Sequence, residues 1–173
     1  MSEKQNIPDF EAVARQILEK LPREVSVIAL NHFKSSFEKQ GFMDVNFQAW
    51  PQRKNDTRVG GAILVATGNL RDSTQIKKAT IERIEISNDA PYAEIHNSGG
   101  IVRLPVTDKM RKYFWYMFKA TGQVRWKYMA ITKKERMIFR MPKRQFIGDS
   151  RILNANIDRA ILNRILTEFK NYK

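Results

Sequence analysis

The stretch APYAEIHNSGG, residues 90–100, is expected to form a corner on which the fold of this chain depends. Tyr92 and Ile95 stand three residues apart, so a single helical turn places their apolar side chains next to each other. The Asn-Ser-Gly-Gly run at residues 97–100 then ends the turn and lets the chain reverse its direction. The pattern predicts a corner of the fold in which Tyr92 is plugged into the core.

A second corner is encoded by MPKRQFIG, residues 141–148. Pro142 has no N–H to give to a β-ladder and therefore ends the strand before it. The guanidinium of Arg144 can reach a carbonyl or a carboxylate through its fork of donors. Phe146 is the apolar side chain that we expect to insert into the core.

Helices are predicted at both ends of the chain from apolar residues that recur at i, i+3 and i+4. We expect one helix at residues 9–20, a break at Pro22, and a second helix at residues 23–40 that Gly41 caps. A closing helix is expected at residues 153–171. Its buried face is predicted to hold Ile157, Ala160, Ile161, Leu162, Ile165 and Phe169.

The middle of the chain is predicted to hold short strands and loops. The pattern predicts a long loop at 42–58, a strand at 78–87, an edge strand at 101–106, a helix at 108–120, and a hairpin of strands 124–131 and 136–141. Strands between flanking helices indicate an α+β fold. We therefore expect a single domain, residues 1–173, with N-terminal helices and a C-terminal helix packed on a small, mainly antiparallel β-sheet.

Positive charge is concentrated in the second half of the chain. The 173 residues carry a net charge of +13, from 31 Lys and Arg and 18 Asp and Glu. Residues 103–151 hold fourteen basic and three acidic residues, which is +11 of that total. Such a field favours a polyanion or an acidic protein surface, and it equally describes a well-solvated face. No apolar run approaches the ~18 residues that span a membrane, and no secretion signal is recognised, so we expect synthesis in a cytoplasm and no membrane contact.

Residues suited to catalysis or metal binding are sparse. The chain has no cysteine, and its two histidines, His32 and His96, are isolated, which is too few for a usual metal cluster. The common nucleophile, phosphate-loop, zinc-protease and dinucleotide motifs are absent. Glu82 and Glu85 would face opposite sides of a strand, so a metal-dependent nuclease is the least favoured interpretation. We expect no enzymatic activity and no cofactor.

The stretch RWKY, residues 125–128, alternates cations and aromatic rings. On a strand, Trp126 and Tyr128 would share one face and offer a stacking platform for nucleic acid beside the cations. The same alternation describes an ordinary strand with one buried face, so both interpretations stay open. The candidate contacts with a polyanion or partner are Arg125, Trp126, Lys127, Lys133, Lys134, Arg136, Arg140 and Lys143.

Four blocks of sequence, taken in order, resemble the phage virion-morphogenesis family, a group of neck and tail-completion proteins like the Mu morphogenesis protein G. The two corners resemble its Tyr-Ala-x-Ile-His-x-x-Gly and Pro-x-Arg-x-Phe-(Ile/Leu)-Gly signatures, although Gln145 stands where the family usually has proline. FKSSFEKQG at residues 33–41, followed by Trp50-Pro51, and LVATGNLRDS at residues 64–73 are similar to its upstream blocks. The signature positions are Gly68, Leu70, Arg71, Tyr92, His96, Gly99, Pro142, Arg144 and Phe146.

The resemblance implies a non-enzymatic structural protein of a tailed phage or prophage that completes the tail or joins it to a DNA-filled head. It implies a homo-oligomeric ring, contacts with other neck or tail proteins, and a place in the neck or tail of the virion. Segment 101–140 is a basic, aromatic insertion whose role the resemblance does not supply. It could line a channel for DNA without sequence preference or meet an acidic surface. The alternative, from charge alone, is a small nucleic-acid-binding regulator.

Overall fold

The structure, a computed structural model, describes residues 9–53 and 60–170. They form two compact units, one from the described residues of 9–98 and 143–170, called the main unit here, and one from residues 99–142, called the basic unit. Helices at both ends and three short antiparallel pairs of strands confirm the predicted α+β class. Within the described part of the chain, no helix is both long enough and apolar enough to cross a membrane.

The longest element is α1 (Phe10–Lys39) in the main unit. The Asp9 carboxylate caps it by accepting hydrogen bonds from the N–H groups of Glu11 and Ala12, both at 3.1 Å. Pro22 lies inside this helix, so the predicted break is wrong. A proline in a helix interior costs ~3 kcal/mol, which the burial of several aliphatic side chains at ~1.5–3 kcal/mol each offsets. Such side chains are buried on both sides of the proline: Val13, Ile17, Val25 and Ala29.

The end of α1 also differs from the expectation. Gln40, and not Gly41, adopts the left-handed conformation of the cap, with a φ of 58°. Gly41 instead starts β1 (Gly41–Met43), which pairs with β2 (Phe47–Ala49), so the expected loop 42–58 contains a hairpin. A Cβ on Gly41 would lie 2.5 Å from atoms of β2, and the close approach of the two strands therefore requires glycine.

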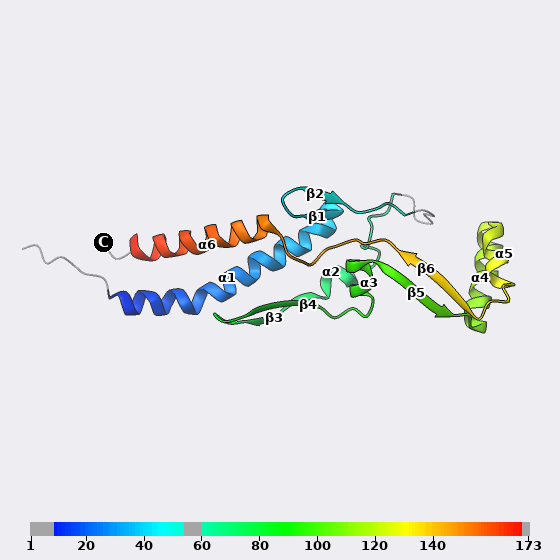
Figure 1. Ribbon diagram of the computed structural model, residues 1–173, viewed down its shortest axis with the longest axis horizontal. Helices are drawn as coiled ribbons and strands as arrows, with labels where there is room; N and C mark the ends of the chain where they lie inside the picture. The colour runs from blue at the N-terminus through cyan, green and yellow to red at the C-terminus, as the bar shows by residue number, and fades with distance from the viewer. Residues whose placement is uncertain (1–8, 54–59, 171–173) are drawn as a thin grey trace, which may run out of the picture. The chain divides into compact units, whose positions relative to one another are not determined.

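Helix α6 (Arg151–Lys170) packs against α1 in the antiparallel direction, as Figure 1 shows. The ring of Phe10, at the start of α1, lies 5.9 Å from the ring of Phe169, near the end of α6. Between these ends, Arg164 of α6 donates to the carboxylate of Glu24 at 3.1 Å. The two terminal helices thus form one antiparallel pair.

The buried face of α6 is narrower than the sequence predicts. Leu153 packs in a cluster with Ala29, Phe33 and Phe42. Leu162 and Phe169, which were expected to be buried, are 59% and 38% exposed, so this part of the prediction is wrong. The physical reason is that α1 covers only one side of α6, whereas the sequence places apolar residues on two sides.

A second hairpin, β3 (Thr74–Ala79) with β4 (Ile84–Asn88), also contacts α1. The single strand predicted at 78–87 is wrong, because the chain turns in its middle. Thr80 and Arg83 exchange two backbone hydrogen bonds of 3.0 and 3.2 Å across that turn. The turn explains why the alternation of apolar residues shifts at this point of the sequence.

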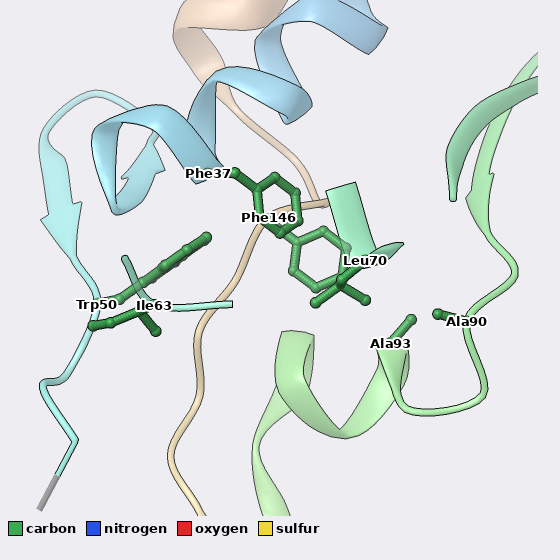
Figure 2. Packing of buried hydrophobic residues seen from close by; sticks show 7 residues of the cluster. All are labelled: Phe37, Trp50, Ile63, Leu70, Ala90, Ala93 and Phe146. Atoms are coloured by element: carbon green, nitrogen blue, oxygen red, sulfur yellow. The ribbon is translucent and has the colours of Figure 1, made fainter. Parts of the chain in front are cut away.

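The core of the main unit gathers at the C-terminal end of α1 (Figure 2). The Phe37 ring lies 5.1 Å from the ring of Phe146 and 5.5 Å from the ring of Trp50. Phe146 is only 1% exposed, which confirms its predicted place in the core. Short helix α2 (Asn69–Asp72) adds Leu70. The buried members are Phe37, Trp50, Ile63, Leu70, Ala90, Ala93 and Phe146.

The basic unit is an antiparallel pair of strands, β5 (Gly100–Pro105) and β6 (Arg136–Met141). The segment of the chain that connects the two strands contains two helices. The helices are α4 (Asp108–Thr121) and α5 (Val124–Ala130). The Thr107 hydroxyl caps α4 by accepting a hydrogen bond from the N–H of Met110. The strands expected at 101–106 and 136–141 and the helix expected at 108–120 are confirmed within a residue or two at their ends.

Residues 124–130 form helix α5 and Ile131 is its C-cap, so the strand predicted at 124–131 and its hairpin with residues 136–141 are wrong. Trp126 stacks on Phe114 of α4 with ring centroids 5.8 Å apart, and Ala130, four residues later, is buried as well. Residues four apart share a face of a helix. Packing against α4 therefore decides the conformation of a short run whose own pattern fits a strand equally well.

Candidate functional site

The corner at residues 90–100 folds into the short helix α3 (Ala93–Ser98). Ala93 enters the core cluster, whereas Tyr92 is 39% exposed, so the prediction that Tyr92 is a core plug is wrong. Ala93 of α3 packs in the same cluster as Leu70 and Phe146 (Figure 2). The Tyr92 hydroxyl accepts a hydrogen bond from Asn69 Nδ2 at 2.7 Å instead.

Asn97, at the end of α3, joins the two sequence corners. Its Oδ1 accepts from the backbone N–H groups of Phe146 at 2.8 Å and Ile147 at 3.0 Å, and its Nδ2 donates to the carbonyl of Ile147 at 3.0 Å. The backbone N–H of Arg144 also donates to the carbonyl of His96 at 2.8 Å. The sequence suggests a turn residue here and misses this role, although an amide that both donates and accepts is suited to it.

Arg144 connects the second corner to the segment after β2. Its side chain is buried, with 7% of its surface exposed, and its Nε and Nη2 donate to the carbonyl of Pro51 at 3.0 and 2.8 Å. Trp50 Nε1 donates to the carbonyl of Gln145 at 2.8 Å in the opposite direction. The expected partner of Arg144 is therefore a carbonyl that lies 93 residues away in sequence.

Beside these braces, the main unit contains a cavity of about 370 Å³, called the signature pocket here. Residues from three of the four sequence blocks meet in its wall, although the blocks are far apart in the chain. Polar side chains are interleaved with aliphatic ones. The pocket is lined by Arg53, Ile63, Leu64, Ala66, Thr67, Leu70, Tyr92, His96 and Arg144.

Two arginines, Arg53 and Arg144, and the imidazole of His96 lie in the wall of the signature pocket. Burial, together with the charge of Arg144, lowers the pKa of His96 below its usual value. Burial and the nearby charge of Arg53 lower the pKa of Arg144 in the same way. The Nδ1 atom of His96 is buried and finds no hydrogen-bond partner in the described chain.

Leu64 adopts a left-handed conformation, with a φ of 61°, which costs a non-glycine residue roughly 1–2 kcal/mol.

The remaining signature positions lie in turns and at the ends of elements. Gly68 precedes α2 with a φ of 77°, and Gly99 follows α3 with a φ of 71°, both in the left-handed region that favours glycine. Arg71 forms an ion pair with Asp72 at 2.8 Å. Pro142 follows the last residue of β6, as expected for a residue that ends a strand. None of these four lines the signature pocket.

The basic unit carries most of the unbalanced charge. Its 44 residues, 99–142, include eleven Lys and Arg and two Asp and Glu, a net charge of +9. All of them are described, and no ion pair is found within this unit. Because none of these cations pairs with an acidic side chain, the unit presents a surface suited to a polyanion or an acidic partner. Lys143, predicted as a contact, belongs to the main unit.

The predicted stacking platform on residues 125–128 is wrong in its geometry. Trp126 is half-buried between α4 and α5, and the guanidinium of Arg125 lies 4.9 Å above its ring. Tyr128 is exposed, but it lies on a helix and not beside Trp126 on a strand. The accessible aromatic residues beside lysines lie on α4. They are Tyr113 and Tyr116, which share a helical stripe with Lys109, Lys112 and Lys119.

Two of the predicted cations, Arg136 and Arg140, come together with Arg103 on β5 and β6. Arg103 pairs directly with Ile138, and Arg136 and Arg140 lie two residues to either side of Ile138 on the same strand. Side chains two apart on a strand share a face, so the three guanidinium groups surround an isoleucine that is 63% exposed. Lys127 lies on α5, and Lys133 and Lys134 lie in the segment that leads to β6.

Among the described residues, no group of three His, Asp or Glu side chains is placed to hold a metal ion. Comparison of the chain with models of protein families, with curated proteins and with solved structures returns no match. The basis for a function is therefore the sequence blocks, the signature pocket that their residues line, and the charge of the basic unit.

Proposed function

We propose that this protein is a non-enzymatic assembly protein of a tailed phage or prophage, which completes the tail or helps to join it to the head. The observation that carries the proposal is the convergence of Leu70, Tyr92, His96 and Arg144, from separate blocks, on one pocket. Around it, side chains are used as braces between distant backbone segments. Residues arranged in this way build a rigid shape, which is what an assembly protein offers its neighbours.

The proposed mechanism is surface complementarity between repeated copies in a ring. In support, α6 carries apolar side chains that the described part of the chain leaves exposed. Leu162 and Leu166 follow the i, i+4 spacing of one helical stripe and are both exposed. Exposed apolar stripes of this kind are typical of surfaces that become buried on association.

The basic unit supplies the second contact that we propose, with DNA and without sequence preference. A protein in the neck of a phage stands next to packaged DNA, and a net charge of +9 without ion pairs suits a phosphate backbone. The alternative contact is an acidic surface of a neighbouring neck protein. Binding to duplex DNA that weakens steeply with salt would support the DNA contact, and none at low salt would favour the acidic protein surface.

Reconstitution of head-to-tail joining tests the function directly. Tails made in the absence of this protein should not attach to DNA-filled heads, and adding the purified protein should restore attachment. Electron microscopy with a specific antibody should place the protein at the upper end of the tail or at the neck. Normal attachment of tails that lack the protein would contradict the proposal.

The second candidate is a small nucleic-acid-binding regulator, which the charge of the basic unit favours. This candidate predicts binding to a preferred sequence at least ~10³-fold tighter than to unrelated DNA, by a protein that never enters a virion. Measured binding to a random library of duplexes separates the two candidates, since the assembly role needs no sequence preference.

A further inference from the structure

The signature pocket contains a buried positive charge that the described chain does not neutralise. Arg144 is 7% exposed, and its hydrogen bonds through the side chain go to a single backbone carbonyl, that of Pro51. The charged group whose field acts on Arg144 is another cation, Arg53. A buried charge without an opposite charge costs several kcal/mol, so a fold that keeps one at a cavity wall is suited to an anion.

The unused donors of Arg144 have the geometry that an anion needs. Nε and one N–H of Nη2 are directed to the Pro51 carbonyl, which leaves the edge of the guanidinium formed by Nη1 and Nη2. Nη1 has no hydrogen bond within the described part of the chain. A carboxylate binds such an edge through two parallel N–H donors.

His96 provides a second, independent anomaly in the same wall. Its Nδ1 is buried and without a hydrogen-bond partner among the described residues, although its imidazole lines the cavity. A buried polar atom of this kind destabilises the fold unless a ligand or water satisfies it. Tyr92, whose ring lies 5.9 Å from the imidazole, closes this side of the pocket.

From these contacts we propose that the signature pocket binds a carboxylate, presented by an acidic side chain of a protein partner. The aliphatic wall of Ile63, Leu64 and Leu70 would hold the methylene stem of the side chain, and Arg144 and His96 would bind its oxygens. A carboxylate needs only these few donors. Arginine binds phosphate as well as carboxylate through its fork, and the carboxylate is favoured here because the aliphatic part of the wall fits the methylene stem of an acidic side chain. That the partner is a virion component rests on the proposed function, whereas the carboxylate preference does not.

Binding should depend on pH in a defined direction. The charged group that acts on His96 is Arg144 from the second corner, on which the charge of Arg53 acts in turn. The ring of Tyr92 lies beside the imidazole. The charge of Arg144 disfavours a protonated imidazole, and a bound carboxylate favours it. Affinity should therefore rise as the pH falls through the pKa of His96, until the carboxylate itself is protonated near pH 4.

The two histidines of this chain make the test sharp, because His32 on α1 is an internal control in the same spectrum. The imidazole Cε1–H signals of the full-length protein are titrated with pH by NMR, at constant ionic strength, with blocked glutamate, blocked glutamine or inorganic phosphate added. Blocked glutamate should raise the pKa of His96 by about 0.5 unit or more, equivalent to a threefold tighter binding to the protonated form. The pKa of His32 should not change, and blocked glutamine should have no effect.

The other outcomes each contradict the proposal. An equal change at both histidines would show a general salt effect, no change at His96 would show that the pocket takes no anion, and a larger effect of phosphate would exclude a preference for carboxylate. The variant Arg144→Lys, which keeps the charge and removes the fork, should weaken the response to glutamate, while the exposed variant Arg159→Lys on α6 should leave it unchanged. The titration of the unmodified protein decides the question even where Arg144→Lys fails to fold. Since it uses purified protein, its failure is distinct from a failure of head-to-tail joining.

Discussion

At the scale of single residues, the main unit is held by polar side chains that bond to distant backbone groups. Arg144 reaches the carbonyl of Pro51, and Trp50 reaches the carbonyl of Gln145. Asn97 alone accounts for three hydrogen bonds to the second corner. Such contacts leave no periodic trace in the sequence, and yet they determine how the two corners are joined.

Replacement of Asn97 by alanine should lower the free energy of unfolding by about 2–3 kcal/mol, because it leaves two backbone N–H groups and one carbonyl without partners. Urea denaturation measures the change. Asn163→Ala, at an exposed position of α6, is the matched control and should change the free energy by less than about 0.5 kcal/mol. Similar effects of the two substitutions would show that Asn97 is not a brace.

The two histidines should make stability depend on pH. Burial lowers the pKa of both His32 and His96. The charge of Lys39 lowers the pKa of His32 further, and the charge of Arg144 lowers that of His96 further. The unfolded chain therefore binds more protons than the folded protein below pH ~6.5. Their contribution is fully present above that pH and is lost as the pH falls toward the lowered values. Thermal unfolding between pH 7.5 and 5 should show a falling midpoint, and the double variant His32→Gln, His96→Gln should flatten that slope. If the midpoint of the double variant falls with pH as steeply as that of the unmodified protein, the two histidines do not cause the pH dependence.

At the scale of elements, tertiary contacts override local signals in both directions. Pro22 should end a helix and does not, because aliphatic burial on both sides keeps α1 continuous. The sequence 124–131 has the alternation of a strand, yet residues 124–130 form helix α5, because Trp126 stacks on α4. The cations of the β5–β6 hairpin lie on neighbouring strands and can be tested as a set.

The triple variant Arg103→Gln, Arg136→Gln, Arg140→Gln should reduce the salt dependence of binding to duplex DNA. Each phosphate contact contributes about 0.9 to the slope of log K against log salt concentration, so up to about 2.7 should be lost. Fluorescence anisotropy at several salt concentrations measures the slope. The control with the same change in charge is Lys20→Gln, Arg159→Gln, Lys170→Gln, at exposed positions of the main unit. Equal losses in the two variants would mean that only total charge matters.

At the scale of the whole molecule, apolar surface and charge are distributed unequally. The main unit leaves the outer stripe of α6 uncovered, and the basic unit holds +9 of the net charge of +13. An uncovered stripe favours self-association, while a large net charge opposes association that does not bury it. We expect the stripe to be the contact between copies.

The double variant Leu162→Ser, Leu166→Ser should shift the protein toward the monomer without a large loss of stability, because both side chains are already exposed. Light scattering coupled to size exclusion measures the mass over a range of concentrations. Ile81→Ser, an exposed isoleucine in the turn between β3 and β4, should leave the mass unchanged. If neither variant changes the mass, the stripe is not an interface between copies.

The α+β class, the terminal helices, the strands of the basic unit, the burial of Phe146 and the location of the charge could all be predicted from the sequence. Each follows from a signal carried by neighbouring residues. Tertiary contacts, in contrast, make α1 continuous through Pro22, make residues 124–130 helical, leave Tyr92 outside the core, and bring His96 and Arg144 to one pocket. These outcomes depend on contacts between residues tens of positions apart, whose packing energies exceed the local preferences of ~1–3 kcal/mol on which sequence interpretation relies.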